Sequence, residues 1–446
     1  MLAFPVGGLG HRTMQRLRKF MWILLLAASV AATAAAQISL PGLPLPKLPE
    51  VNDPLAGTLR TAQSAARMEL RKLRIRELLR TERDRVEADP DGQPILRSQV
   101  GALSPTPEAL ARARDAGFTI LSEESLAGLG LTMVVLRAPK GMSTRRALKR
   151  LRELDPEGSY DYNHLYLDSG AVSGAESETA PPAQIPAPAA LPARASAARI
   201  GLIDSGVDGA HPALAGTTIR RFGCAGALLP QAHGTAVASL LVGQAEGFRG
   251  AMPGAELYAA DVFCGHPGGS IALLSIALDW MVREHVAVIN ISLVGAKSVL
   301  LTQLVRVMSQ RGHLMVAAVG NDGPAAPPLY PAAYPEVVGV TGVDAKERVL
   351  PEACRGKHVA YAAPGADMRA AALDGGWSEV RGTSFAAPIV AGLLAGWLPD
   401  PDAGQARVAL EMLAGTAFDL GPKGVDTTYG KGLVGASLRV PMRPEK

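Results

Sequence analysis

The sequence predicts an α/β protein with a doubly wound, mainly parallel sheet, preceded by a small α+β domain. In the second half of the chain, apolar strand-like runs alternate with apolar helix-like stretches, which is the pattern of βαβ units. Some of these strands, such as residues 286–293, are apolar almost throughout, as expected for strands buried on both faces of a parallel sheet. Shorter strands and helices alternate between about residues 95 and 170, which favours a separate α+β unit.

The elements of the larger domain follow from these periods. The expected strands are residues 200–204, 257–263, 286–293, 314–320, 337–343 and 359–363. The expected helices, which should cover both faces of the sheet, are residues 234–242, 270–284, 299–310, 384–398 and 405–413. In the small domain we expect helices at residues 109–116 and 144–154, and strands at residues 118–123, 131–136 and 160–167.

Length and composition set the limits of function. A chain of 446 residues is long enough for two or more domains, and 48% hydrophobic with 19% charged residues suffices for globular cores. Aromatic residues make up 4% of the chain, so nothing supports a surface on which nucleic-acid bases would stack. The net charge of +4 comes with no nucleic-acid recognition motif, and we expect no nucleic-acid partner.

The N-terminus has the pattern of an export signal. Four basic residues lie between positions 12 and 19, residues 20–32 are apolar, and Ala34, Ala35 and Ala36 form a small-residue cleavage pattern. We expect cleavage after Ala36. The alternative, an uncleaved anchor, is disfavoured because the strongly apolar part falls short of the ~20 residues that a span needs. The protein would then be secreted or periplasmic, and would meet the membrane only transiently, through the signal peptide.

Composition divides the rest of the chain. Within residues 37–170, residues 37–56 are rich in Pro and Leu and extended, and residues 59–88 predict a long, charged amphipathic helix. The small α+β domain follows at about residues 95–170. An Ala- and Pro-rich linker spans residues 171–197, and the larger domain spans residues 198–446.

Ser384 lies in a Gly-Thr-Ser turn that opens directly into an apolar helix. A hydroxyl and its backbone N–H would lie at a helix N-terminus, where unpaired donors and the positive end of the dipole favour developing negative charge. Such a serine can be a nucleophile. Taken alone, the turn favours an ordinary N-cap, because Ser and Thr are common caps.

Three further polar residues lie where a strand ends or a helix begins. Asp204 ends an apolar strand, His233 precedes an apolar helix, and Asn321 follows a third apolar run. This rim is where α/β sheets place ligands. In one pocket, Ser384 would attack, the imidazole would take its proton and the carboxylate would fix the imidazole tautomer. Asn321 would donate a hydrogen bond to the oxyanion.

Four stretches of the chain carry a family resemblance: GLIDSGVDGAHPAL, HGTAVASLLVG, AAVGNDGP and GTSFAAPIVAGLLA. Together, in the order Asp, His, Ser, they resemble the subtilisin-like serine endopeptidases, or subtilases, from about Ile200 to Gly435. The resemblance implies that Asp204, His233 and Ser384 form the triad and that Asn321, with the Ser384 N–H, forms the oxyanion hole.

The resemblance also implies a propeptide and a substrate cleft. The small domain would act as a folding chaperone and as a tethered, intramolecular inhibitor, with cleavage in or beside residues 168–198. The residue before the scissile bond of a polypeptide substrate would be bound by Ser292, Leu293, Val294, Gly295, Ala317, Ala318, Val319 and Gly320. These residues are small or apolar, which predicts a preference for small-to-medium apolar side chains.

Two other serine-hydrolase folds fit less well. An α/β-hydrolase needs a histidine after its nucleophile, but the last histidine is His358, and Ala386 breaks the G-x-S-x-G pattern. A chymotrypsin-like order would require Asp261 or Asp344 to follow His233 on an all-β scaffold. The alternating strands and helices around these residues argue against that scaffold.

The three cysteines are Cys224, Cys264 and Cys354. In an oxidising compartment one pair can form, and sequence alone leaves three pairings open. We favour Cys224–Cys264, since it would close a loop around the helix that follows His233. The chain has no C-x₂-C or H-E-x-x-H spacing, and no acidic loop of the calcium-binding type surrounds Asp208. No metal or cofactor is expected.

Two functions from different classes remain. The first is an exported serine endopeptidase, made as a self-processed zymogen. The second is a catalytically silent envelope scaffold that binds peptides through the same cleft. The intact set of four polar groups favours the enzyme.

Overall fold

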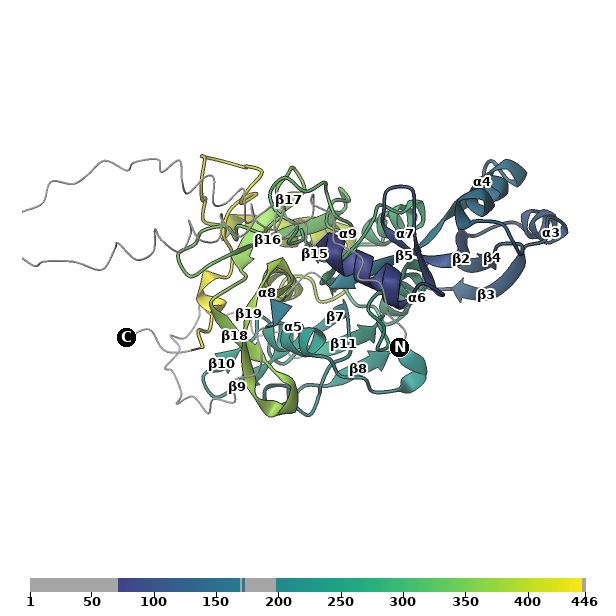
Figure 1. Ribbon diagram of the computed structural model, residues 1–446. Coiled ribbons are helices and arrows are strands. Elements are labelled where there is room, and N and C mark those ends of the chain that lie inside the picture. The colour runs from purple at the N-terminus through teal and green to yellow at the C-terminus, as the bar shows by residue number, and fades with distance from the viewer. Residues whose placement is uncertain (1–70, 169–170, 173–197, 443–446) are drawn as a thin grey trace, which may run out of the picture. The chain divides into compact units, whose positions relative to one another are not determined.

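The computed structural model of the chain describes residues 71–168, 171–172 and 198–442 (Figure 1). All of them belong to one compact unit, Leu55–Lys446. The predicted signal peptide, the extended segment 37–56, the first part of the charged helix and most of the linker lie outside the described residues. Within the described part of the chain, no helix is long and apolar enough to cross a membrane.

Seven parallel strands form the large sheet, in the order β17-β16-β15-β13-β7-β11-β8. Their bounds are β7 (Arg199–Asp204), β8 (Ile219–Phe222), β11 (Glu256–Asp261), β13 (Val288–Ile291), β15 (Leu314–Ala318), β16 (Val337–Val343) and β17 (Val359–Pro364). Strand β8 escapes prediction because it is short and has two arginines at its centre. The strand order reverses at β7, so the carboxyl end of β7 is the switch point at which such sheets bind ligands.

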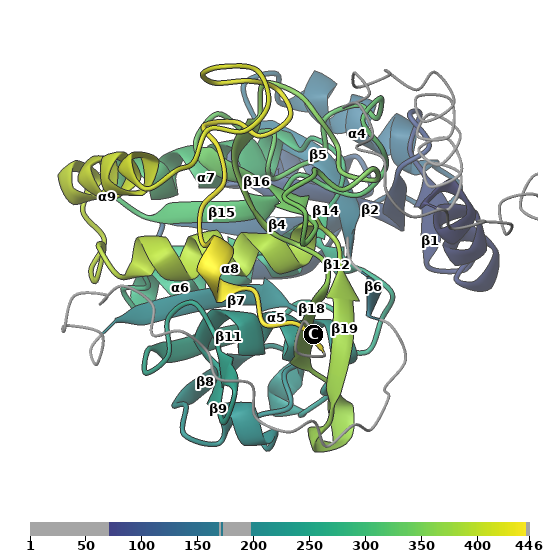
Figure 2. The ribbon, with the colours of Figure 1, turned by 90° about the vertical axis from the view of Figure 1, so that its left-hand side faces the viewer.

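Helices cover both faces of this sheet. They are α5 (Ala232–Val242), α6 (Ile271–Arg283), α7 (Val299–Gln310), α8 (Thr383–Ala395) and α9 (Ala403–Gly415). Side chains of β7 alternate between the two faces: Leu202 packs in the core that includes α5, α8 and α9, and Ile203 in the core that includes α6 and α7. Helix α8 packs against β13, β15 and β16 of the large sheet (Figure 2).

Short strands surround the large sheet. They are β6 (Ala171–Val172), β9 (Gln244–Ala245), β10 (Phe248–Arg249), β12 (Gly269–Ser270), β14 (Leu293–Val294), β18 (Met368–Ala371) and β19 (Trp377–Arg381). Two of these strands show that a sequence-based prediction was wrong. The strand expected at 286–293 ends in the sheet at Ile291, and β14 leaves the sheet to pair with the small domain. The expected linker begins with β6, because Val172 and Ala171 pair with Val380 and Arg381 of β19.

The small domain has a β-α-β-β-α-β arrangement. It contains β2 (Pro94–Leu103), α3 (Pro107–Asp115), β3 (Thr119–Leu126), β4 (Leu131–Arg137), α4 (Thr144–Leu154) and β5 (Ser159–Asp168), with antiparallel strand order β5-β2-β4-β3. This is the topology of a ferredoxin-like unit. Strand β2 escapes prediction because its register shifts between Ile95 and Val100, and Ser98 has a φ of 59°. Such a bulge breaks the two-residue alternation that marks a strand.

Both faces of the small sheet are covered. In β4, Val134 and Leu136 pack with residues of α3 and α4, whereas Met133 and Val135 pack with residues of α6 and α7. The small sheet is thus sandwiched between its own helices and two helices of the large domain (Figure 1).

The charged segment before the small domain, residues 71–93, is called the N-terminal arm below. Residues 71–81 are helical, and the predicted continuation of the helix to residue 88 is wrong. Instead, Val86–Ala88 form β1, which pairs with the start of β2. The turn between them is held by Asp89, whose Oδ1 accepts hydrogen bonds from the N–H groups of Asp91 and Gln93. The helix is anchored by Ile75 and Leu78, which pack against Leu165 and Leu167 of β5.

Candidate active site

Three sequence-predicted residues meet at the carboxyl end of β7. Asp204 is the last residue of β7, His233 lies in the first turn of α5, and Ser384 lies in the first turn of α8. His233 Nδ1 is 2.9 Å from Asp204 Oδ1 and 3.0 Å from Oδ2, and His233 Nε2 is 3.0 Å from Ser384 Oγ. The line from carboxylate through imidazole to hydroxyl has the geometry of an activated nucleophile.

The environment of His233 favours its protonated form. Burial lowers the pKa of His233, but the negative charge of Asp204 and its hydrogen bond outweigh burial and raise the pKa above its ordinary value. Asp204 is only 1% exposed, and its Oδ1 accepts hydrogen bonds from both the backbone N–H (2.7 Å) and the hydroxyl (3.2 Å) of Ser205. These bonds hold the carboxylate in the orientation that receives the imidazole.

Ser205 and Gly234 bring β7 and α5 together. The Ser205 hydroxyl accepts a hydrogen bond from Gly234 N–H at 3.1 Å. A Cβ on residue 234 would lie 2.3 Å from the Ser205 carbonyl oxygen, so only glycine permits this approach. The approach places His233 directly over the end of β7.

The start of α8 is irregular in a way that involves the nucleophile. Pro388 lies four residues after Ser384 and has no N–H to donate to the Ser384 carbonyl. The hydroxyl of Ser292 donates to that carbonyl instead, at 3.0 Å, and Ser292 Oγ accepts a hydrogen bond from Asn290 Nδ2 at 2.8 Å. Ser292, which the sequence assigned to the substrate pocket, is therefore also bonded to the backbone of the nucleophile.

Asn321 lies beside the turn that carries Ser384. Its Oδ1 accepts a hydrogen bond from Thr383 N–H at 3.0 Å, and the Thr383 hydroxyl accepts one from Gly320 N–H at 3.1 Å. With Oδ1 occupied, the Nδ2 hydrogens can serve another acceptor. Thr383 escapes prediction as a site residue, since a threonine before a helix looks like an ordinary cap.

The remaining predicted pocket residues lie at the ends of β15 and around β14. All eight pocket residues, Ser292–Gly295 and Ala317–Gly320, are buried in this structure. The end of β5 covers part of this pocket. Leu293 pairs with Asp168, and Val294 pairs with Leu167. The Tyr166 hydroxyl donates to the carbonyl of Ala296 at 2.8 Å.

Two short stretches of the chain, before and after residues 169–170, pair with strands of the large domain. Before residues 169–170, which lie outside the described residues, β5 pairs with β14; after them, β6 pairs with β19, the strand that leads into the Ser384 turn. Residues 167–168 and 171–172 therefore run antiparallel to β14 and β19, respectively. This is strand addition, the way in which extended peptides are bound by exposed sheet edges.

The N-terminal arm also reaches this region. Arg71 Nη1 lies 3.2 Å from Asp322 Oδ2, next to Asn321, and both side chains are nearly buried, at 13% and 14% exposed. Arg74 forms an exposed ion pair of 3.2 Å with Asp168. Burial raises the pKa of Asp322, and the charge of Arg71 opposes that shift. Sequence reasoning misses these pairs because their partners lie far apart in the chain.

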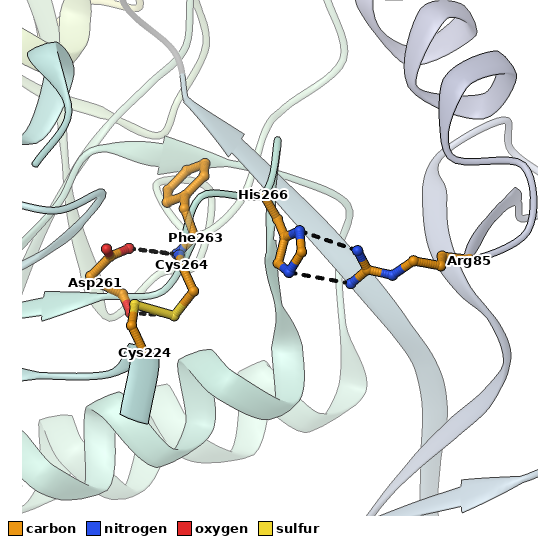
Figure 3. Close-up of a disulfide and its surroundings, with 6 residues drawn as sticks. All are labelled: Arg85, Cys224, Asp261, Phe263, Cys264 and His266. Atoms are coloured by element: carbon orange, nitrogen blue, oxygen red, sulfur yellow. Dashed lines mark hydrogen bonds between the residues drawn. A yellow bond between two sulfur atoms is a disulfide. The ribbon is translucent and has the colours of Figure 1, made fainter. Parts of the chain in front are cut away.

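Figure 3 shows the disulfide that joins Cys224 and Cys264. The neighbouring Asp261 lies beside Asp204 in the register of β7 and β11, and its Oδ1 accepts hydrogen bonds from the N–H groups of Phe263 and Cys264. Asp261 and the two cysteine sulfurs are the one group of described residues close enough to hold a metal ion, but the sulfurs are bonded to each other. The third cysteine, Cys354, is buried, and burial raises the pKa of its thiol to about 12, which keeps it protonated.

The fold and this geometry define a class: an α/β protein with a parallel sheet whose switch point carries an Asp-His-Ser constellation. The sequence model of the Subtilase family matches residues 195–432, and the chain belongs to this family. Minor extracellular protease Epr of Bacillus subtilis is 32% identical over 45% of this chain and 32% of its own length. Subtilisin Savinase of Lederbergia lenta is 32% identical over 46% of this chain and 76% of its own length.

A solved structure has the same fold over a larger part of the chain. Fervidolysin from Fervidobacterium pennivorans, described as a keratinolytic enzyme related to subtilisin, is 21% identical with a TM-score of 0.63, over 80% of this chain and 63% of its own. The match spans 32% of Epr and 64% of subtilisin amylosacchariticus, so this chain matches only part of the length of these relatives.

Proposed function

We propose that the chain is an exported serine endopeptidase that is made as a self-processed zymogen. The observation that carries the proposal is the hydrogen-bonded line from Asp204 through His233 to Ser384. Membership of the subtilase family supports the same chemistry.

The reaction proceeds in two acyl-transfer steps. Ser384 Oγ attacks the scissile carbonyl while His233 Nε2 takes the hydroxyl proton, and Asp204 stabilises the imidazolium that forms. The C–N bond then breaks as His233 returns the proton to the leaving amine, which gives an acyl-enzyme. Water, deprotonated by His233, then attacks the ester carbonyl. The bond to Ser384 Oγ breaks as His233 returns the proton to that oxygen, which releases the acid. In both steps the oxyanion is bound by the Ser384 N–H and by Asn321 Nδ2.

Self-processing would occur at a bond near Ser384. Because β5 pairs up to Asp168 with β14, and β6 pairs from Ala171 with β19, the strand that leads to Ser384, we place the cut between Asp168 and Ala171. The new N-terminus would belong to the catalytic domain, and the segment ending near Asp168 would remain in the cleft as an inhibitory product. The proposed cleavage site therefore lies at the N-terminal end of the range 168–198 that the sequence analysis gives for cleavage.

The small domain would then serve as chaperone and inhibitor. Asp161 Oδ2 accepts a hydrogen bond of 2.8 Å from Val299 N–H, the first residue of α7, and Asn163 Oδ1 accepts one of 3.3 Å from Ala272 N–H in the first turn of α6. Side chains of β5 thus accept hydrogen bonds from first-turn N–H groups of two helices of the other domain, in addition to the N-caps Ser270 and Ser298, which supports a role in assembling it. The N-terminal arm, which packs on β5 and reaches Asp322, would add to the inhibition.

Location and specificity follow from the sequence. The predicted signal peptide, residues 1–36, supports export to the periplasm or the medium, and the relative Epr is named as extracellular. The small, apolar residues at 292–295 and 317–320 support cleavage after small-to-medium apolar side chains. Sequencing of products from a peptide library would test this, and a majority of cuts after Lys or Arg would refute it.

Labelling with a fluorophosphonate tests the catalytic proposal. The exported wild-type chain should be modified at Ser384, and the Ser384→Ala and His233→Ala variants should not react, the second because its serine lacks a base. A silent peptide-binding scaffold would give no labelling in the wild type either.

The same Ser384→Ala variant tests self-processing. Mass spectrometry should find the wild-type N-terminus between residues 169 and 171, while the variant should keep its small domain attached and begin at Gln37. A mature N-terminus unchanged by Ser384→Ala would show that another protease makes the cut.

A further inference from the structure

An ion pair outside the triad links the loop that carries Asn321 to the strand that leads to Ser384. Arg381 Nε lies 2.7 Å from Glu352 Oε1, and Arg381 Nη2 lies 3.1 Å from Oε2. The Glu352 side chain is 1% exposed and that of Arg381 is 36% exposed. Two parallel N–H···O bonds of this kind fix the separation and the relative orientation of the two groups.

Glu352 and the residues after it hold the loop that carries Asn321 through backbone hydrogen bonds. The Glu352 carbonyl accepts a hydrogen bond of 2.8 Å from Gly323 N–H, and two residues later Cys354 N–H donates one of 3.0 Å to the Gly320 carbonyl. Residues 352–354 therefore bind the loop on both sides of Asn321. A shift of Glu352 would carry that loop with it.

The other member of the pair, Arg381, lies on the strand that leads to the nucleophile Ser384. Arg381 is the last residue of β19, three residues before Ser384, and the residue before it, Val380, pairs with Met368 of β18. Gly382 N–H donates to the Gly365 carbonyl at 2.8 Å, so the segment between Arg381 and Ser384 has little freedom to absorb a displacement.

We propose that Arg381 and Glu352 are a positioning pair that sets the separation of the two oxyanion donors, the Ser384 N–H and Asn321 Nδ2. The inference rests on the proposed peptidase activity. The two loops also meet at Thr383, through its bonds to Asn321 Oδ1 and Gly320 N–H. With the Thr383 contact alone, the loop of Asn321 could still rotate relative to the turn of Ser384. The ion pair is a second contact between the two segments, and the two contacts together fix both their separation and their relative orientation.

An ion pair at this place is poorly explained by stability. Burying the Glu352 carboxylate costs free energy of hydration, and apolar replacements of buried ion pairs are often neutral or stabilising. A bidentate pair does supply directional geometry, which oxyanion donors require because their catalytic effect depends on placement relative to the transition state.

The test compares Arg381→Gln and Glu352→Gln with the wild type in the full-length chain after export. We expect kcat/KM to fall about 10- to 100-fold, mainly through kcat, which is less than the roughly 10²–10³ lost with a whole oxyanion donor. The affinity for a peptide aldehyde, whose adduct places an oxyanion in the hole, should fall in parallel. The affinity for a product-like peptide, which has no such oxyanion, should stay within about twofold of the wild type.

Two charge-keeping variants and one control complete the design. Arg381→Lys and Glu352→Asp keep the charges but lose the fork, and they should lose part of the activity; they carry the test if the glutamine variants do not fold. Arg348→Gln removes an ion pair in which two guanidinium nitrogens of an exposed arginine contact one carboxylate oxygen of Asp344, away from the loop of Asn321, and should leave all constants unchanged. Fluorophosphonate labelling of Ser384 should persist in every variant.

Unchanged aldehyde affinity, or a rise in KM with kcat intact, would overturn the positioning role. Absence of labelling in the wild type would instead refute the proposed peptidase activity, so the two failures are distinguishable.

Discussion

Buried polar side chains have different partners in the two domains. In the large domain, Asp204, His233 and Ser384 bond to one another, so their charges and protons are coupled. In the small domain, Asp161 and Asn163 bond to backbone N–H groups of the other domain, at the starts of α7 and α6. The first arrangement can move a proton, whereas the second can only hold helices in place.

The apolar cores differ in the same sense. The large sheet is covered on both faces by helices of its own domain, whereas Met133 and Val135 of the small sheet are buried in a core that they share with α6 and α7. A sheet with one apolar face uncovered is poorly stable alone. The large domain thus contains the coupled polar groups, and the small domain needs contacts with the large domain for its stability. Substitutions in the two domains should therefore affect different measurements.

The largest effect is expected from Asp204→Asn. Loss of the carboxylate should reduce kcat about 10⁴-fold, because the asparagine fails to hold the catalytic tautomer of the histidine. The pH profile should change as well. Asp204 raises the pKa of His233, and activity needs the neutral imidazole, so the acid limb of kcat/KM should move to lower pH in the variant. An acid limb that stays in place would mean that another group controls it.

A smaller loss is expected from Asn321→Ala. Removing this donor should lower kcat by roughly 10²–10³, about 2.7–4 kcal/mol, with little change in KM. The variant also leaves Thr383 N–H without its acceptor, so Asn321→Asp, which keeps an oxygen for that bond, is the matched comparison. If the aspartate variant were as active as the wild type, the amide hydrogens of Asn321 would have no catalytic role.

In the small domain, Asp161→Ala should affect stability and not turnover. Loss of the hydrogen bond from Val299 N–H at the start of α7 should destabilise the uncleaved chain by about 0.5–2 kcal/mol. Urea unfolding in the Ser384→Ala background, where the domains stay joined, measures this difference. Glu124→Ala, at an exposed position in β3, is the control. Equal unfolding midpoints for the two variants would exclude a contribution from this hydrogen bond.

Much of the large domain could be predicted because its strands are apolar throughout and its polar groups fall at strand ends. The end of the charged helix was wrong for a local reason: Pro90, Asp91 and Gly92 form a turn signal that the helical spacing of residues 59–88 obscured. The ion pairs of Arg71 and Glu352 could not be predicted, since each joins residues whose proximity is produced by the tertiary fold. A sequence pattern reports periodicity along the chain and says little about such partners.

The smallest effect is expected where the arm meets the cleft. Arg71→Ala should speed the appearance of activity after export up to about fivefold, because its loss removes on the order of 1 kcal/mol of attraction between the arm and Asp322. The gain should shrink as the pH falls through the raised pKa of Asp322, since a protonated carboxyl no longer attracts Arg71. Arg80→Ala, which removes an exposed pair within the arm helix, should leave the rate unchanged. Equal activation rates for wild type and Arg71→Ala at neutral pH would mean that β5 alone inhibits, and that the arm only packs against it.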